Sequence, residues 1–462
     1  MARKPVNPFV RGQKATQKYL SSHAEPENLQ ARKVTTSIGA FGHALAIPAQ
    51  AEGAPLARCL SRIPAGPEGQ NLIVVVVNAC ADASQAVIRS NRDSLQAIDA
   101  EFELIEPLSE HVALRRHPTG RLVVIDRTEA HPLPARQGVG LARKLGCDFL
   151  LGAMEDGALV SPWLHCSDAD TRLPEDYFRQ ASEQARKDAS ALLYRFRHRP
   201  DETTPDTFAL SQEYESSLRY YVLGLRYAGS PHAFHSVGSA MAVHAHAYAR
   251  VRGFPRREAA EDFYLLNKLA KDGSIQTLQG LPVEPSARSS DRVPFGTGAA
   301  IQKRQATPDE ELRVYHPDLF QYLQIWEASL ARCLKQPELT PDLPRVVASQ
   351  ARGTANVDGA RLLDALTESE ALIRAQRALN GPDATITQAL RDNLDAFRTL
   401  RLVHALRDRD LGEMALREAL QRAPFIKLET DAQNLPIHEI ADQLERLDYR
   451  PDSNKTGARA RQ

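Results

Sequence analysis

Hydrophobic residues in the first half of the chain form short runs that predict strands, most of them followed by a polar residue. Residues 72–77 are a continuous β-branched run without alternation, which is typical of a parallel strand covered on both faces. Residues 44–47 predict a short strand that ends at Pro48, and residues 121–126 and the run from Trp163 into Asp168 predict strands that end in a polar residue. The pattern therefore predicts four buried strands.

Helical spacing separates these strands. Apolar residues recur at helical intervals between Val87 and Ile98, and residues 138–146 predict a helix that Gly146 closes. Strands that alternate with helices predict an α/β, Rossmann-type fold with a mainly parallel sheet and right-handed crossovers. We therefore expect the polar residues after the strands to share one edge of the sheet.

The alternation continues beyond Asp170. The predicted elements are a helix from Pro174 to about Lys187, a strand at 191–194, a helix at 214–225, a strand at 238–243, a short helix with a turn at 247–254, and a helix that begins at Glu261-Asp262 and ends at Asp272-Gly273. Acids at the start of a helix lie favourably at the positive end of its dipole.

After about residue 305 the pattern becomes helical. Two apolar stripes are Leu319, Leu323, Trp326 and Leu330 on one helix face, and Leu390, Leu394, Phe397, Leu400 and Val403 on another. The sequence thus predicts an N-terminal arm (1–40), an α/β domain (41–304) and an α-helical C-terminal region (305–462). The arm is polar, and its prolines should interrupt any long helix, so we expect a solvated segment.

Composition adds little to this picture except exclusions. In the 462-residue chain, 58 Lys and Arg residues balance 58 Asp and Glu residues. The chain therefore has no net positive charge that would attract nucleic acid or an anionic membrane surface. No apolar run approaches the roughly 20 residues of a spanning helix, and no secretory signal is recognisable. Five widely spaced cysteines without a Cys-x-x-Cys favour reduced thiols. We expect a soluble, cytoplasmic protein.

The candidate chemistry centres on Asp168-Ala169-Asp170. If the preceding strand stops at Asp168, both acids lie where ligands usually bind in an open α/β sheet. The pair is then a candidate site for a divalent metal that carries a diphosphate. Alone the triplet is weak evidence, because Asp-x-Asp mostly occurs in solvated turns.

The order of several motifs resembles that of the family 2 nucleotide-sugar glycosyltransferases, whose catalytic domain has the GT-A fold. The matching stretches, within about residues 43 to 300, are Pro48-Ala49-Gln50-Ala51-Glu52, Gly140-Leu141-Ala142-Arg143-Lys144, Ser167-Asp168-Ala169-Asp170, Gly253-Phe254 and Glu261-Asp262. The resemblance implies a GT-A-like domain that transfers a sugar from a nucleoside-diphosphate sugar.

Two departures from the family pattern change what is expected. The family commonly has Asp-Asp-Gly-Ser after the second strand, whereas this chain has Asn78-Ala79-Cys80-Ala81, so Asp82 or Asp126 would have to supply the carboxylate. The Gln-x-x-Arg-Trp signature of processive, membrane-embedded members is absent; the run at 302–304 lacks the Trp. A non-processive enzyme fits better.

The resemblance also implies residue roles. Asp170 would bind Mg²⁺ or Mn²⁺, Asp168 the ribose or the metal, and Arg143 the diphosphate. Asp262 would be the general base of an inverting transfer, and Glu261 would support it or bind acceptor. The implied nucleotide-sugar site comprises Pro48, Gln50, Glu52, Asn78, Asp126, Arg143 and Asp168. Structural alternatives are a surface cation for Arg143 and helix-capping acids for Glu261 and Asp262.

Other features are weaker. His232, His235, His244 and His246 could supply a third metal ligand, although ordinary surface or satisfied histidines explain them better. A loop from Arg288 to Gly298, including Ser289 and Arg292, could form a lid over the diphosphate or a structural turn.

The sequence leaves two competing functions open. A nucleotidyltransferase would usually have a glycine-rich basic segment after the first strand, where this chain has Gln50-Ala51-Glu52. A degenerate GT-A domain that serves as a binding scaffold is favoured by the replaced Asp-Asp segment and opposed by the retained acid pairs. The acceptor is open among a glycan, a lipid-linked molecule and a small molecule, and the C-terminal helices are candidates for homo-oligomer contacts.

Overall fold

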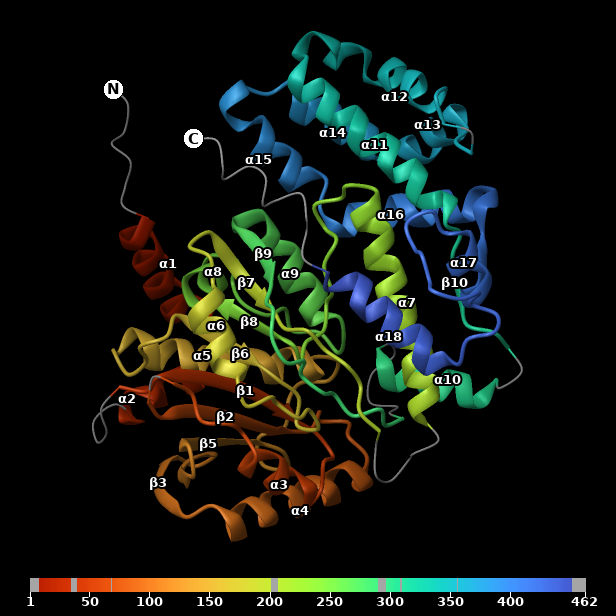
Figure 1. The fold of residues 1–462 in the computed structure, drawn as a ribbon. Coiled ribbons are helices and arrows are strands. Elements are labelled where there is room, and N and C mark those ends of the chain that lie inside the picture. The colour runs from red at the N-terminus through yellow and green to blue at the C-terminus, as the bar shows by residue number, and fades with distance from the viewer. Residues whose placement is uncertain are drawn as a thin grey trace, which may run out of the picture. The chain divides into compact units, whose positions relative to one another are not determined.

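The computed structural model describes residues 8–34, 40–67, 69–200, 207–289, 296–307, 310–354 and 356–450 (Figure 1). The chain forms two compact units. The α/β unit comprises Met1–Asp201, Ser236–Ala287 and Arg292–Gly296, and the helical unit comprises Glu202–His235, Arg288–Asp291 and Thr297–Gln462.

A nine-stranded sheet forms the centre of the α/β unit, with the order β3-β4-β5-β2-β1-β6-β8-β7-β9. Its strands are β1 (His43–Ala49), β2 (Asn71–Asn78), β3 (Leu104–Ser109), β4 (Val112–His117), β5 (Gly120–Arg127), β6 (Trp163–Cys166), β7 (Ala189–Leu193), β8 (Met241–His244) and β9 (Ser274–Thr277). The central strands β5, β2, β1 and β6 are parallel to one another.

Helices cover this sheet. They are α1 (Pro8–Ser22), η1 (Pro26–Gln30), α2 (Ala31–Val34), α3 (Pro55–Ser61), α4 (Gln85–Glu101), α5 (Gly138–Glu155), α6 (Tyr177–Gln184), α8 (Ala245–Arg250) and α9 (Glu261–Asp272). Every residue of β1 and β2 is buried, as the apolar runs predict for strands covered on both faces. The predicted α/β fold with a mainly parallel sheet is confirmed.

Three strands of the sheet were not predicted: β9 at one edge, and β3 and β4 at the other. β3 and β4 pair antiparallel with each other, and β4 also pairs antiparallel with β5. β3 is an exposed edge strand in which only Leu108 is fully buried, and β4 buries the alternate residues Val112 and Leu114. Neither strand therefore contains the continuous apolar run that marks the central strands of the sheet.

Pro48 was expected to end the first strand, but it lies inside β1 and pairs with Val76 of β2. The pairing of β1 with β6 stops at Ala46, whose carbonyl accepts a hydrogen bond from Ser167 N (3.2 Å) on the β6 side. Pro48 comes two residues later and faces that same side, beyond the last ladder position. Its missing N–H therefore costs no ladder hydrogen bond.

Gly146 was expected to close a helix, but α5 continues through it to Glu155. A Cβ atom at Gly146 would lie 2.9 Å from Ala46 Cβ and 3.7 Å from a Val76 methyl group. The glycine therefore permits close packing of α5 on β1 and β2 instead of forming a C-cap.

The N-terminal segment is also more ordered than its polarity predicts. α1 is a 15-residue helix, and Tyr19, Thr16 and Glu27 are at most 2% exposed. The polar side chains are buried here because partners in α5, α8 and β5 satisfy them.

Helices dominate the helical unit, as predicted for the C-terminal region, but this unit also includes Glu202–His235, which was expected within the α/β domain (41–304). Its helices are α7 (Thr207–Tyr227), α10 (Thr297–Ala306), α11 (Asp318–Lys335), η2 (Pro337–Asp342), α12 (Leu343–Ala351), α13 (Gly359–Glu368), α14 (Ala371–Leu379), α15 (Asp383–Asn393), α16 (Ala396–Leu406), η3 (Arg407–Leu411), α17 (Leu416–Arg422) and α18 (Ile437–Asp448). Two short strands that were not predicted, β10 (Arg313–Tyr315) and β11 (Glu413–Ala415), form an antiparallel pair.

The first apolar stripe of this unit is confirmed, because Leu319, Leu323, Trp326 and Leu330 are all buried on α11. The second stripe is divided between two helices. Leu394 follows the end of α15, and the side chain of Asp395 caps α16 by accepting a hydrogen bond from Arg398 N (3.0 Å).

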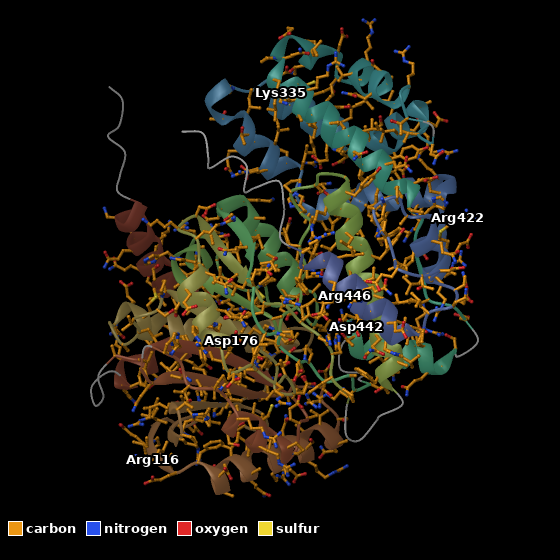
Figure 2. All side chains as sticks on the ribbon, viewed as in Figure 1. Arg116, Asp176, Lys335, Arg422, Asp442 and Arg446 are labelled. Atoms are coloured by element: carbon orange, nitrogen blue, oxygen red, sulfur yellow. The ribbon has the colours of Figure 1, made fainter. Side chains whose placement is uncertain are left out.

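Charged side chains occupy the solvent side of these helices, as Lys335, Arg422 and Arg446 illustrate (Figure 2). Among the described residues, no helix combines the length and the apolar content that crossing a bilayer would require.

Candidate active site

The parallel register brings the predicted polar residues to one edge of the sheet. Val77 pairs with Asp126 and Ala49 pairs with Val77, so the ends of β5, β2 and β1 lie side by side. β6 runs parallel to β1 and leads directly into Ser167 and Asp168. The carboxyl edge of an open α/β sheet is the usual place for a ligand.

Arg143 is the central side chain of this edge. Its Nε donates to Glu261 Oε1 (2.7 Å), its Nη2 to Asp168 Oδ1 (2.5 Å), and its Nη1 to Gly238 O (2.9 Å). Burial alone would lower the pKa of Arg143, but the carboxylates of Asp168 and Glu261 outweigh burial and raise it. The guanidinium is 3% exposed and joins the end of β6 to the start of α9.

This finding excludes one of the two sequence interpretations of Arg143, the surface cation, and leaves the diphosphate role as a prediction. A buried guanidinium with four protein partners, the fourth being Ser167 O (3.4 Å), is not a surface helix cation. Its hydrogen bonds to Asp168 and Glu261 hold these two carboxylates in place.

Two glycines make room for this arrangement. A Cβ atom at Gly238 would lie 2.6 Å from Arg143 Nη2. A Cβ atom at Gly140 would lie 2.4 Å from Pro255 O and 2.7 Å from Arg257 O, and Gly140 N donates to Arg257 O (3.0 Å). α5 can therefore approach the loop before α9 only with glycine at position 140.

Asp262 follows Glu261 in the first turn of α9, which begins where the sequence predicts. Burial and the negative charge of Glu261 raise the pKa of Asp262 to about 7, against the opposing effect of Arg143. A carboxylate with a pKa near neutrality is well suited to accept a proton at physiological pH.

Asp170 and Glu52 lie near a common neighbour, Cys59. Burial raises the pKa of the Cys59 thiol to about 11, with further contributions from the charges of Asp170 and Glu52. Arg199 Nη2 donates to Asp170 O (3.1 Å) and holds the Asp-Ala-Asp loop. The loop after β1 and the loop after β6 thus bring their acids to the same part of the edge.

A divalent cation can bind to these carboxylates if water and a substrate complete its coordination. Within the described ranges, no three His, Cys, Asp or Glu side chains are grouped to hold a metal ion by themselves. Mg²⁺, however, is commonly bound by one or two carboxylates together with water and substrate phosphates. Asp168 and Asp170 can supply such carboxylates.

Asn78 is buried, with 1% of its surface exposed, and its amide donates to Ala49 O (2.9 Å). Asn91 of α4 donates to Asn78 O (2.8 Å) and accepts from Ala51 N (2.7 Å), where the backbone is left-handed (φ 54°). These two asparagines brace the loops after β1 and β2, and Asn78 presents little surface to a nucleotide.

The remaining predicted nucleotide residues differ in exposure. Pro48 is buried within β1, whereas Gln50 and Glu52 are partly exposed in the following loop. Asp126 is partly exposed, and its Oδ1 accepts hydrogen bonds from Thr128 N (3.0 Å) and Thr128 Oγ1 (2.5 Å). Asp82, the alternative carboxylate, is exposed.

The histidines do not form one cluster. His232 contacts Leu394 O (2.9 Å) and His235 contacts Asp448 (2.7 Å), all within the helical unit. His244 ends β8, where burial lowers its pKa to about 4, and His246 contacts Thr16 Oγ1 (2.9 Å). Only His244 and His246 of these four lie next to each other, with ring centroids 5.6 Å apart.

The predicted lid loop is described only in part. Residues 290–295, which include Arg292, lie outside the described residues, and α10 begins at Thr297. Thr297 and Gly298 are therefore helical.

Three residues of the edge were missed by sequence reasoning. Asn91 carried a detectable signal, because α4 buries Asn91, Ser94 and Ile98 on one face and a polar residue within a buried stripe needs partners. Arg199 and Gly238 carried none, since their contacts join segments that are distant in sequence.

Comparisons with known proteins found matches only among solved structures. No protein-family model and no curated protein matches the chain. A mannosyltransferase from Pyrobaculum calidifontis, PcManGT, in complex with GDP-Man and Mn²⁺, is 16% identical, with a TM-score of 0.32, over 83% of this chain and 99% of its own. S. aureus TarS 1-349 in complex with UDP is 11% identical, with a TM-score of 0.31, over 90% of this chain and 92% of its own. Likeness at this level carries no argument about function.

Proposed function

We propose that this protein transfers a sugar from a nucleoside-diphosphate sugar to an acceptor hydroxyl, with the help of Mg²⁺ or Mn²⁺. The observation that carries the proposal is the buried Arg143, which joins Asp168, in the candidate donor site, to Glu261, beside the candidate base. One guanidinium thus couples the two groups of acids that such a reaction needs.

Each acid has a distinct part in this reaction. Asp168 and Asp170 would hold the cation, which neutralises the diphosphate as it leaves. Asp262 would take the proton from the acceptor hydroxyl while the acceptor oxygen forms its bond to the anomeric carbon. The bond from that carbon to the diphosphate breaks, and the configuration inverts. Burial and the charge of Glu261, which Arg143 fixes, would keep the pKa of Asp262 high enough for this step.

The proposal is tested by incubating the protein with Mn²⁺, a panel of nucleoside-diphosphate sugars and candidate acceptors. We expect released nucleoside diphosphate with one donor and loss of release in Asp170→Asn. Absence of metal-dependent binding of labelled UDP or GDP would instead favour the scaffold function, and released pyrophosphate from a nucleoside triphosphate and a sugar phosphate would favour a nucleotidyltransferase.

A further inference from the structure

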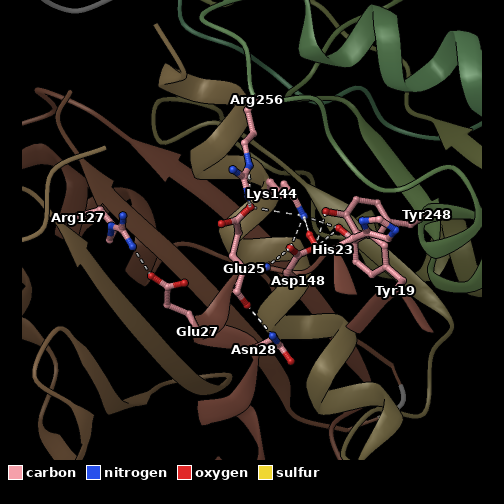
Figure 3. Close-up of polar contacts among 10 residues, drawn as sticks. All are labelled: Tyr19, His23, Glu25, Glu27, Asn28, Arg127, Lys144, Asp148, Tyr248 and Arg256. Atoms are coloured by element: carbon pink, nitrogen blue, oxygen red, sulfur yellow. Dashed lines mark hydrogen bonds and ion pairs between the residues drawn. The ribbon is translucent and has the colours of Figure 1, made fainter. Parts of the chain in front are cut away.

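A buried carboxylate anchors the N-terminal segment to α5 and α8 (Figure 3). Asp148, which is fully buried, accepts hydrogen bonds from Tyr19 Oη (2.6 Å), Tyr248 Oη (2.9 Å), Glu25 N (2.8 Å) and Lys144 Nζ (2.6 Å). Burial raises the pKa of Asp148, and Lys144 opposes this effect. Two of these four donors, Tyr19 Oη and Glu25 N, belong to the N-terminal segment, so the buried carboxylate holds the segment at two points.

Lys144 connects this anchor to the candidate active site. It also donates to Tyr19 Oη (2.6 Å) and His23 O (2.9 Å), and it directly follows Arg143 on α5. The N-terminal segment therefore binds the same helical turn that carries the central guanidinium of the site.

Glu25 binds the loop before α9. Its Oε1 accepts hydrogen bonds from Arg256 Nε (3.0 Å) and Arg256 Nη2 (2.6 Å) (Figure 3). Close by, a Cβ atom at Gly253, which has a φ of +67°, would lie 2.4 Å from Tyr19 Oη. The N-terminal segment and this loop thus approach each other too closely for any residue except glycine at position 253.

The loop leads from Arg256 directly to the candidate base. Arg257 O accepts from Gly140 N (3.0 Å), and Ala260 adopts a left-handed conformation (φ 57°) immediately before Glu261 and Asp262. A non-glycine residue in this conformation persists only when its surroundings hold it. Glu25 and Gly140 are two such restraints, which hold the loop at Arg256 and at Arg257.

We propose that Glu25, acting through Arg256, is a positioning residue that fixes the loop before α9 and so places Asp262 against the acceptor hydroxyl. The inference rests on the proposed function for the role of Asp262. Glu25 lies more than 200 residues before the base in sequence and needs no contact with donor or acceptor.

The test substitution is Glu25→Gln, and the matched control is Glu27→Gln. Both glutamates are buried (9% and 2% exposed) and both bind an arginine, but Glu27 pairs with Arg127 of β5 (2.5 Å) and does not contact the loop before α9. We expect kcat to fall about tenfold in Glu25→Gln while the donor KM changes less than about twofold, because a base displaced by about 1 Å loses up to roughly 10²-fold.

Two further measurements separate positioning from general destabilisation. Arg256→Gln should lower kcat as much as Glu25→Gln does, and the double variant should be no slower than either single variant. Because Arg256 is half-exposed, its substitution also tests the proposal if Glu25→Gln fails to fold. Amide hydrogen exchange of residues 254–262 should be faster in Glu25→Gln than in the wild type or Glu27→Gln.

Equal loss of kcat in Glu25→Gln and Glu27→Gln, or additive losses in the double variant, would overturn the positioning role. If the wild type transfers no sugar, the proposed function fails, while unchanged exchange of residues 254–262 in Glu25→Gln would independently refute the restraint itself.

Discussion

At the scale of single residues, the protonation of Asp262 sets the expected pH dependence. Its pKa is about 7 in the folded protein, because burial and Glu261 disfavour the charged form. A base must be deprotonated, so kcat should rise as the pH increases through about 7 and then level off. The measurement is kcat from pH 5 to 9 at saturating donor; a pH-independent kcat would contradict this role.

The same pKa predicts a stability change of defined sign. The folded protein binds this proton more tightly than the unfolded chain, whose Asp pKa is about 3.9. The stabilisation of the folded state by this protonated carboxyl is present in full below about pH 4 and is lost as the pH rises through about 7. Asp262→Asn should therefore flatten the fall in free energy of unfolding between these pH values, measured by urea denaturation.

Gly238 allows a direct test of the space around Arg143. Gly238→Ala places a methyl group 2.6 Å from Arg143 Nη2, so we expect a loss of about 1–3 kcal/mol in the free energy of unfolding together with reduced turnover. Gly353→Ala is the control, because its methyl group would meet only Gln350 O at 3.8 Å. Equal stability of both variants in urea would show that Arg143 has room to move.

At the scale of elements, helix caps can be tested separately from the site. The side chain of Asp358 accepts hydrogen bonds from Ala360 N (2.8 Å) and Arg361 N (3.3 Å) at the start of α13. Asp358→Ala should cost the helical unit about 1 kcal/mol in urea unfolding. Asp364→Ala, in the exposed middle of the same helix, should change the free energy by less than about 0.5 kcal/mol; the reverse order would contradict the capping role.

The elements that the sequence predicts well are those with strong local patterns. The runs in β1, β2, β5 and β6 and the acidic start of α9 are explicit in the sequence, and the structure places them as expected. Gly146 and Pro48 misled the prediction, because their neighbours in adjacent elements, Ala46 and the short β6, decide what they do. Tertiary contacts of this kind leave no local signal.

The candidate site shows the same limit. The acids Asp168, Asp170, Glu261 and Asp262 could be singled out from their positions in the chain. The burial of Arg143 and its hydrogen bonds to Asp168 and Glu261 could not, because they depend on contacts between α5, the end of β6 and α9. The N-terminal segment is buried for the same reason, through Asp148 of α5.

At the scale of the whole molecule, binding of metal and nucleotide should be mutually dependent. Two carboxylates alone hold a cation weakly, and the diphosphate completes the donor set. UDP or GDP with Mn²⁺ should therefore raise the Tm, because a ligand at 100 times its Kd stabilises the folded protein by about 2.7 kcal/mol. Nucleotide alone or Mn²⁺ alone should have little effect. Asp170→Asn should abolish the shift; an equal shift without metal would exclude this site.

The most direct test of the central claim is turnover by Asp262→Asn, with Asp272→Asn as the control at the other end of α9, where Arg250 binds Asp272 (2.6 Å). The amide keeps the size of the side chain but cannot accept the acceptor proton. We expect kcat to fall about 10²–10⁴-fold while donor binding persists. Turnover close to that of the wild type, in a folded Asp262→Asn protein, would contradict the assignment of Asp262 as the base.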